Sequence, residues 1–231
     1  MSAVSTALLT QAHKLRLLCM GLIVAAIVMP ASAMAQGIPG KFDYYTLALS
    51  WSPSFCSTPA GRNSQQQCGT KRRFAFVVHG LWPQYNRGWP QFCAKKAPYL
   101  PNRLIRSYYD IMPSKRLIIN QWKKHGTCSG LKAAEYFSTT RTLFEKIKIP
   151  ARYLVPNQTI VTTPAQVTED FINTNRFLTT NMISVQCGNI TRRARLKEVR
   201  ICFGRDGRPA KCGSNETRQC RARQLILPPA R

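Results

Sequence analysis

Two histidines stand in short motifs whose residue types can do acid–base chemistry. His79 lies in the segment FVVHGLWP, and His125 lies in QWKKHGTC directly after Lys124. The unperturbed pKa of histidine is near neutrality, so two imidazoles held together can serve as a general acid and a general base. A lysine beside them adds a positive charge that stabilises a developing anion. In a strongly basic chain, these groups have the chemistry to cleave RNA without a metal ion.

The spacing around the second histidine predicts a shared helix face. Gln121 lies four residues before His125, and residues four apart face the same side of a helix. Gly126 allows the chain to leave the helix just after the histidine. Taken alone, the His125 motif is equally compatible with an incidental histidine on a basic helix, and a single histidine at a strand end such as His79 is more often structural. The two motifs together favour a catalytic pair.

Hydrophobic patterns indicate the elements that must hold these residues. A partly alternating aromatic segment at 42–51 and a β-branched run at 73–78, with His79 at its exit, predict strands. Ser114 is placed to cap a helix that runs to His125. Further helices are expected at 102–112, at 133–146 and from Thr168 to residue 175, further strands at 185–187 and 196–202, and a loop at 81–101. Strands interleaved with segregated helices predict one α+β domain, with a mostly antiparallel sheet covered by helices and stabilised by disulfides.

The N-terminal segment 1–35 has the three parts of a secretory signal peptide. Two basic residues precede an apolar run at 17–29, and Ala-Met-Ala at 33–35 provides a cleavage site. The alternative is an N-terminal membrane anchor, which the short run and the small-residue site disfavour. We therefore expect an exported protein, periplasmic or extracellular, whose catalytic domain is 36–231 and which has no membrane segment once the signal is removed.

The charge of the chain points to a polyanionic partner. Of the 34 Lys and Arg residues, 32 lie in 36–231 against 9 acidic residues, a formal charge of +23. Such a charge can simply serve solubility. A phosphate-backbone partner is the sharper interpretation, because a cationic surface gains affinity by releasing counterions. The positive residues are spread through the chain, which indicates a broad field and favours RNA as the partner.

The cysteines agree with export. Eight of the nine cysteines follow the signal segment, and an even number in an exported chain suggests four disulfides whose pairing the sequence leaves open. A zinc site is the alternative, but there is no Cys-x-x-Cys motif. We expect no metal and no other cofactor. The eight residues are Cys56, Cys68, Cys93, Cys128, Cys187, Cys202, Cys212 and Cys220.

In their order and separation, the two histidine motifs resemble the two active-site segments of the ribonuclease T2 family. The upstream segment SWSPSFC at 50–56 and the late cysteines extend this resemblance over essentially all of 36–231. It implies an α+β endoribonuclease that works without a metal. It further implies cleavage of single-stranded RNA through a 2′,3′-cyclic phosphate to 3′-phosphate ends, with low base specificity. We expect the enzyme to be a monomer.

The resemblance also implies roles for individual residues. His125 matches the general base that takes the proton of the ribose 2′-OH, and His79 matches the general acid that protonates the leaving 5′-oxygen. Lys124 matches the cation that stabilises the phosphorane. Because the 2′-OH is the nucleophile, DNA should be bound without being cut.

Base-binding residues are expected near the first strand and in the loop after His79. The candidates are Ser50, Trp51, Tyr85 and Trp89, and core or loop packing is the alternative for each. Trp82 either packs under His79 or stacks on a base, and packing is favoured.

The resemblance further implies a disulfide pairing. The expected links are Cys56–Cys68, Cys93–Cys128, Cys187–Cys220 and Cys202–Cys212. The second of these links would hold the two histidine motifs together.

One position departs from the family pattern. The family usually has glutamate directly before the tryptophan of the second motif, whereas this chain has Gln121, preceded by Asn120. A neutral amide can hydrogen-bond a phosphate oxygen, but it cannot shift the pKa of a neighbouring imidazole as a carboxylate does. An exported basic protein that binds RNA or another polyanion with little turnover is therefore the alternative function. The retained pair of His79 and His125 favours the enzyme, because binding alone needs no imidazole pair.

Overall fold

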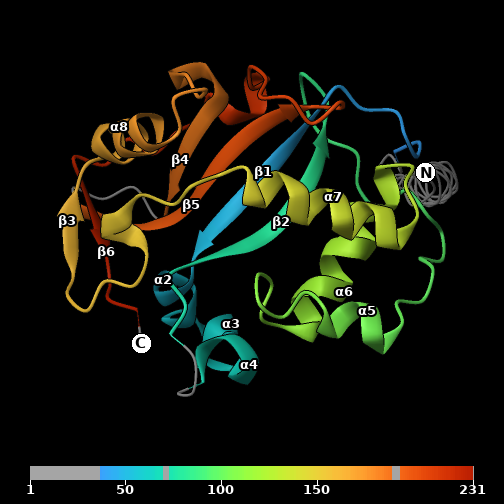
Figure 1. The fold of residues 1–231 in the computed structure, drawn as a ribbon, viewed down its shortest axis with the longest axis horizontal. Coiled ribbons are helices and arrows are strands. Elements are labelled where there is room, and N and C mark those ends of the chain that lie inside the picture. Colours follow the sequence, from blue (N-terminus) through green and yellow to red (C-terminus); the bar gives the residue numbers. More distant parts are fainter. Residues whose placement is uncertain (1–36, 70–72, 189–192, 231) are drawn as a thin grey trace, which may run out of the picture. The chain divides into compact units, whose positions relative to one another are not determined.

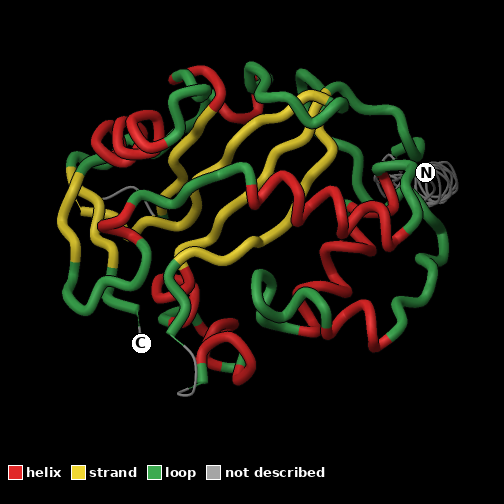
Figure 2. Tube along the Cα trace, in the orientation of Figure 1, coloured by secondary structure: helices red, strands yellow, loops and turns green. Residues whose placement is uncertain are grey.

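Helices surround a curved sheet in the computed structural model (Figures 1 and 2), which describes residues 37–69, 73–188 and 193–230. These residues belong to one compact unit, Gln36–Arg231. The expected signal peptide at 1–35 lies outside the described residues. Within the part of the chain that the structure describes, no helix is long and apolar enough to cross a membrane.

The sheet is mostly antiparallel, as the sequence predicted. Strand β1 (Tyr44–Trp51) lies between the edge strand β2 (Phe76–Gln84) and the long strand β5 (Arg193–Gly204), which also pairs with β4 (Ile183–Cys187). The start of β5 pairs in parallel with β6 (Gln224–Leu227), and β6 continues to β3 (Ile160–Thr162). β1 and β5 therefore lie in the middle of the sheet.

One face of this sheet is apolar and forms the core. Leu47 of β1 is in register with Leu81 of β2 and with Ile201 of β5, and all three are fully buried. Helix α7 (Ala133–Glu145) crosses this face over β1 and β2 (Figure 1). The hydroxyl of Tyr136 in α7 donates to the Leu81 carbonyl oxygen at 2.7 Å. Apolar burial and this hydrogen bond hold α7 on the sheet.

The opposite face carries polar side chains. Directly paired residues of adjacent strands share a face, so this face can be read from the β1–β5 register. Thr46, Ala48 and Ser50 of β1 pair with Cys202, Arg200 and Glu198 of β5, respectively. The small β1 side chains leave room for the two charged ones.

Helix α6 (Lys115–Lys124) lies beside the edge strand β2 and ends at His125. The hydroxyl of Ser114 caps it by accepting the N–H of Leu117 at 3.3 Å, as predicted. Trp122 is buried and packs against the rings of Tyr136 and Phe137 in α7. This packing fixes the helix so that its last turn reaches the polar face of the sheet.

Shorter elements complete the fold. Three helices follow β1 and precede β2 in the sequence, and α8 packs against β4. The α-helices are α2 (Ser52–Cys56), α3 (Pro59–Arg62), α4 (Gln65–Cys68), α5 (Asn102–Arg106) and α8 (Pro164–Thr174), and the 3-10 turns are Gly126–Cys128, Ala151–Tyr153, Thr180–Met182 and Ser214–Glu216.

Three expectations about the elements were wrong. β2 does not end at His79 but continues to Gln84, so residues 81–84 belong to the strand and not to a loop. The helix expected over 102–112 is α5, which ends at Arg106 and is followed by turns. Helix α8 begins before Thr168, because Thr163 caps it by accepting the N–H of Gln166 at 3.1 Å. The proline that follows Thr163 suits the first turn of a helix and marked this start.

The four disulfides are those that the resemblance implied. Cys56–Cys68 closes the segment of α2 to α4, and Cys187–Cys220 joins β4 to the chain before β6. Cys202–Cys212 closes a loop after β5, and Cys93–Cys128 joins the loop after β2 to the turn that follows α6. The last of these links connects the two histidine motifs.

Candidate active site

His79 occupies a β-bulge in the edge strand. Ala48 pairs with Gly80 and Leu49 pairs with Val78, so the described β1–β2 register leaves His79 without a partner residue. A bulge bends a strand and redirects a side chain. The His79 side chain is 34% exposed, which leaves it accessible to a substrate on the polar face.

A buried carboxylate holds the ring of His79. Its Nδ1 atom lies 2.6 Å from Oε1 of Glu198, whose side chain is only 2% exposed. The second oxygen of Glu198 accepts Nε–H of Arg200 at 2.9 Å. Burial raises the pKa of Glu198, but the hydrogen bond with His79 and the charges of His79 and Arg200 outweigh it and lower the pKa to about 2. An ionised Glu198 thus fixes Nδ1, so that Nε2 is the nitrogen left to transfer a proton.

His125 is buried at the end of α6. Its ring stacks on the indole of Trp82, with ring centres 5.2 Å apart and planes 28° apart. Burial, together with the charges of Lys124 and His79, lowers the pKa of His125 to about 3. Among the described groups, its Nδ1 atom finds no hydrogen-bond partner. His125 is therefore a neutral imidazole near neutral pH, the form that can accept a proton.

The indole of Trp82 connects the two histidines. The ring of His79 packs edge-on against it, with ring centres 5.2 Å apart. The indole Nε1–H of Trp82 donates to Oε1 of Gln121 at 2.7 Å. A Cβ on Gly80 would lie 2.2 Å from that same Oε1 atom, so only glycine fits beneath this hydrogen bond. Gln121 and His125 thus reach one indole from a single helix face, in agreement with their spacing.

The loop after β2 fixes the end of α6. The N–H of Phe92 donates to the carbonyl oxygen of Lys124 at 2.9 Å, and the neighbouring Cys93 is bonded to Cys128. Phe92 has a φ of 50°, a conformation that bulky residues rarely adopt. Strained positions of this kind persist where the surrounding structure holds them. Two anchors therefore set the position of the turn that carries Lys124 and His125.

A cavity of about 510 Å³ lies between α2 to α4, β1, β2 and α6. This volume suits a small organic ligand such as a nucleobase. His79 and Gln121 are in its wall. Its other lining residues are Ser50, Phe55, Ala60, Asn63, Ser64, Gln65, Gln66, Gln67, Val77, Ser114, Arg116, Leu117 and Asn120. Across the described ranges, no three His, Cys, Asp or Glu side chains gather as they would around a metal ion.

The sequence model of the Ribonuclease T2 family matches residues 42–212. The chain belongs to the ribonuclease T2 family. A ribonuclease of Aeromonas hydrophila is 35% identical over 188 residues, which cover 80% of this chain and 83% of that protein. A probable ribonuclease of Haemophilus influenzae is 38% identical over 140 residues, which cover 55% of this chain and about half, 52%, of that protein.

Solved structures of a ribonuclease and of an RNase-related protein share this fold. An RNase-related protein from Calystegia sepium has a TM-score of 0.64 and 25% identity, over 82% of this chain and 98% of that one. A mutant of RNase MC1 in complex with 5′-UMP has a TM-score of 0.63 and 21% identity, over 80% of this chain and 97% of that one. The α+β fold is confirmed, and with the family and its ribonuclease relatives it makes this chain a T2-type endoribonuclease.

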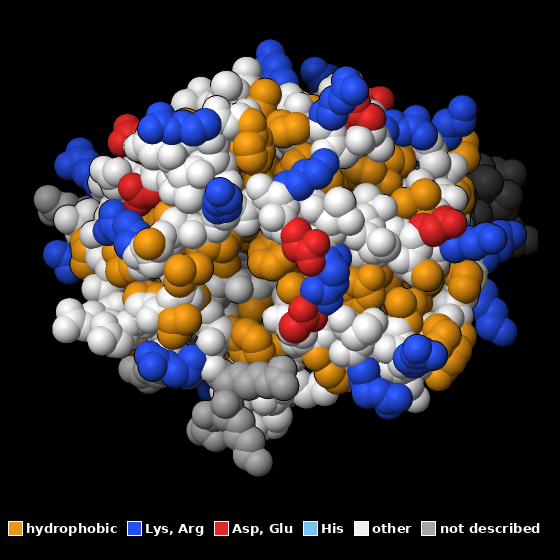
Figure 3. Space-filling model, viewed as in Figure 1, with side chains coloured by type: hydrophobic (Ala, Val, Ile, Leu, Met, Phe, Trp, Pro, Cys, Tyr) orange, Lys and Arg blue, Asp and Glu red, His pale blue; other side chains and the backbone are white. Residues whose placement is uncertain are grey.

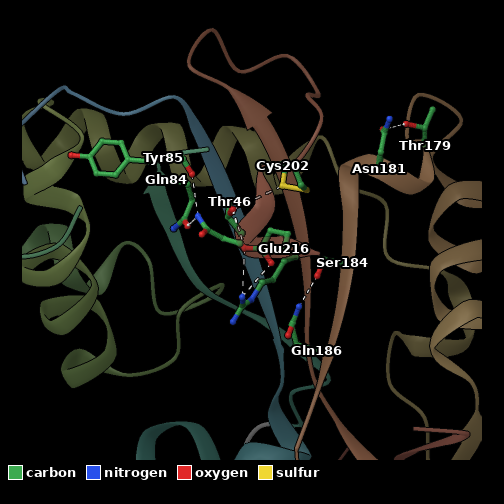
Figure 4. The surroundings of a disulfide bond; sticks show 12 residues. Thr46, Gln84, Tyr85, Thr179, Asn181, Ser184, Gln186, Cys202 and Glu216 are labelled. Atoms are coloured by element: carbon green, nitrogen blue, oxygen red, sulfur yellow. Dashed lines mark hydrogen bonds and ion pairs between the residues drawn. A yellow bond between two sulfur atoms is a disulfide. The ribbon is translucent and has the colours of Figure 1, made fainter. Parts of the chain in front are cut away.

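The structure separates the residues that the T2 resemblance offered for binding bases. Ser50 lines the cavity beside His79. Trp51 is fully buried, and its indole N–H donates to the carbonyl oxygen of Pro228 at 3.0 Å. Tyr85 follows β2 and its ring is directed away from the polar face around Glu216 (Figure 4). Trp89 is 53% exposed in the following loop. Of these residues, only Ser50 is in the wall of the cavity.

Sequence reasoning missed Glu198, which lies 119 residues after His79 in the chain. It also missed Arg200 and Glu216, which contact the same carboxylate or its partner. The available signal was the strand pattern at 196–202, where Glu198 and Arg200 are two residues apart and hence on one face. Two charges on one face of a strand rich in apolar residues indicate a partner within the fold.

Proposed function

We propose that this enzyme cleaves single-stranded RNA by transphosphorylation, with His125 as the general base and His79 as the general acid. His125 takes the proton of the ribose 2′-OH, and the resulting oxygen attacks the adjacent phosphorus. The bond from phosphorus to the 5′-oxygen breaks, and that oxygen receives a proton from His79. The products are a 2′,3′-cyclic phosphate and a free 5′-OH.

The second step hydrolyses the cyclic phosphate with the roles reversed. His79, now neutral, takes a proton from water, which attacks phosphorus. The 2′-oxygen leaves with a proton from His125, so both rings return to their starting state and the product is a 3′-phosphate. Each placed imidazole contributes on the order of 10²–10⁴-fold to such a proton transfer.

Lys124 supports these steps by charge. Lys124 directly precedes His125, and the charge of its ammonium group helps to lower the pKa of that imidazole. A fixed cation near the phosphate stabilises the extra negative charge of the phosphorane. Gln121 in the wall of the cavity offers an amide to a phosphate oxygen or a base.

Substrate binding follows from surface charge and the cavity beside His79. Lys and Arg side chains are spread over the face seen in Figure 3, with few acidic ones among them. Such a surface attracts the RNA backbone without reading its sequence. The amide-rich lining of the cavity, with Ser50, can hydrogen-bond several bases, which suits low base specificity. An exported monomer, periplasmic or extracellular, is the form in which we expect the enzyme to act.

The observation that carries this function is the packing of both imidazoles against Trp82, with His79 also facing the cavity. The test uses a short single-stranded RNA, with EDTA present, and the same oligonucleotide with 2′-deoxyribose throughout. We expect the RNA to be cleaved and the deoxy strand to stay intact. Mass spectra of successive time points should show the cyclic phosphate before the 3′-phosphate. Tight binding without turnover would indicate the polyanion-binding alternative, and cleavage of the deoxy strand or loss of activity in EDTA would refute the mechanism.

A further inference from the structure

Arg200 contacts the supports of both histidines from the middle of the sheet. We propose that it is a positioning residue that holds His79 and His125 in a fixed relation to each other, an inference that rests on the proposed function. Neither histidine contacts Arg200 through a described hydrogen bond; one is reached through Glu198 and the other through Trp82.

The first connection runs through a carboxylate. Arg200 lies 2.9 Å from Oε2 of Glu198 through both Nε and a terminal guanidinium nitrogen. The other oxygen of Glu198 holds Nδ1 of His79. Both contacts of this fork fall on Oε2 while His79 engages Oε1, so the two oxygens of Glu198 are held from two sides and the carboxylate orients the imidazole.

The second connection runs through the indole. The guanidinium carbon of Arg200 lies over the ring of Trp82, 4.9 Å from its centre. That indole is the surface on which His125 stacks. A planar guanidinium can bond a carboxylate along its edge and stack on an aromatic face at the same time, which an ammonium group cannot do.

Glu216 holds the far end of the guanidinium. Its Oε2 atom lies 3.2 Å from a terminal nitrogen of Arg200, and its side chain is 2% exposed. The hydroxyl of Thr46 donates to its other oxygen at 3.4 Å. Figure 4 shows Glu216 directed at Thr46 of β1, beside Cys202, whose disulfide to Cys212 closes the loop before Glu216. The loop that carries Glu216 thus supplies a carboxylate that contacts Arg200 of β5 and Thr46 of β1.

The charges of this cluster explain why a cation is required between the two carboxylates. Glu198 and Glu216 are both nearly inaccessible to water and both lie against Arg200. The guanidinium thus lies between two carboxylates, and His79 contacts one of them. Removing one partner from a buried ionic cluster leaves uncompensated charge, which displaces the remaining groups or unfolds the site. The groups displaced first are those that hold His79 and Trp82.

The test compares Arg200→Lys, which keeps the charge but not the fork, with Arg195→Lys on the same strand. Arg195 is exposed, so Arg195→Lys is the same substitution at a position outside the polar cluster. We expect kcat of the Arg200 variant to fall on the order of 10²-fold, the effect of a misplaced catalytic group, with KM changed by no more than about twofold. The control should retain kcat and KM within about twofold, since exposed charges contribute little.

Two further measurements separate positioning from general stability. In the parent, the proton on Nδ1 of His79 should give a downfield NMR signal, because it is held by a carboxylate, and Arg200→Lys should shift or broaden that signal in a protein with native circular dichroism. If Arg200→Lys does not fold, Glu216→Gln is the second variant. It keeps the fork on Glu198 while it loosens the guanidinium, and we expect a smaller fall in kcat with the same unchanged KM.

The outcomes are decisive for each statement separately. A folded Arg200→Lys enzyme with the parental kcat, pH–rate profile and NMR signal would overturn the positioning role, as would a loss confined to KM. The proposed function fails instead if His79→Ala retains activity. Inactive His79→Ala beside fully active Arg200→Lys would leave the function intact and refute this inference alone.

Discussion

The two faces of the central sheet differ in what they contribute to the protein. On one face, Leu47 and its register partners pack under α7 and contribute hydrophobic stability. On the other face, Arg200 and Glu198 are paired and hydrogen-bonded at a considerable cost in desolvation. The apolar face determines whether the chain folds, and the polar face determines where two imidazole rings lie.

The difference shows how one sheet meets two requirements. Because successive side chains point to opposite faces, β1 and β5 can place a core residue and a site residue next to each other in sequence. A substitution on the apolar face should therefore affect mainly stability, and one on the polar face should affect mainly activity. The predictions below test this separation.

The largest effect is expected from the histidines themselves. His79→Ala or His125→Ala should each lower RNA cleavage on the order of 10²–10⁴-fold, since a placed proton donor or acceptor is lost. Circular dichroism should show that the fold is retained. Turnover close to that of the parent in either folded variant would show that the polar face does not carry the chemistry.

A core truncation on the opposite face should have the reverse profile. Leu47 is fully buried, so Leu47→Ala should lower the free energy of unfolding by about 2–5 kcal/mol. The folded fraction should keep the parental kcat. Leu154→Ala is the control, because Leu154 is 55% exposed and should cost no more than about 0.5 kcal/mol. Equal losses in urea unfolding, or a large fall in kcat for Leu47→Ala, would break the separation of the faces.

Gly80→Ala tests the contact between β2 and α6. The new Cβ would lie 2.2 Å from Oε1 of Gln121 and 2.6 Å from Nε1 of Trp82. Overpacking of this kind costs about 1–3 kcal/mol, and here it also breaks the hydrogen bond that positions the indole. Both stability and kcat should fall. Gly188→Ala is the matched control, since a Cβ there meets no described atom within 4 Å apart from its chain neighbours. An equal loss of stability and kcat in both variants would refute the close fit at Gly80.

Acid should destabilise the polar face first. The pKa of His125 is lowered from 6.5 to about 3 and that of Glu198 from 4.5 to about 2. Both shifts make the unfolded state bind more protons, so the stability they represent is present above the unfolded pKa and is lost as pH falls. The free energy of unfolding should start to fall below about pH 6.5, by up to about 1.4 kcal/mol per pH unit.

The control for this acid response is His125→Gln, measured by urea unfolding between pH 7 and 3. Its decline should begin only near pH 4.5, where the unfolded-state carboxylates start to bind protons. The same decline from pH 6.5 in both proteins would mean that His125 is not the group responsible.

Gln121→Glu should have the smallest effect on rate and a clear effect on pH dependence. A carboxylate at this position can still accept the N–H of Trp82, and it adds a negative charge beside the indole that covers His125. That charge should raise the pKa of His125, so the corresponding limb of the pH–rate profile should move to higher pH, with kcat rising a few-fold at most. A profile with both limbs unchanged would show that residue 121 is not coupled to the base.

The sequence predicted the local features and missed the distant ones. Ser114 and the helix to His125 follow from a capping residue and short-range periodicity, and the structure confirms both. The bulge at His79 could not be read locally, because a bulge is a mismatch between two strands and only β1 defines it. The helices α2 to α4 and the strands β3 and β6 were not predicted, since such short segments carry too few residues to show a period.

The site shows the same division. The two motifs predicted His79, His125, Lys124 and Gln121 in one region; the structure brings His79, His125 and Gln121 into contact with Trp82. The residues next to Gln121 in the sequence include no carboxylate, whereas the carboxylate of the site is Glu198, whose side chain reaches His79 across β1. Contacts that cross the sheet depend on register, and register depends on the whole fold.

The bulge at His79 also bears on how this fold can evolve. The paired residues of β1 and β2 each face one side of the sheet, whereas His79 is an extra residue without a partner in the described β1–β2 register. His79 nevertheless contacts Glu198 through Nδ1 and packs against Trp82. A replacement at this position leaves the register of Leu47 and Leu81 intact, but it removes a partner from a buried carboxylate. Variation at residue 79 is therefore limited by the polar cluster and not by the hydrophobic core.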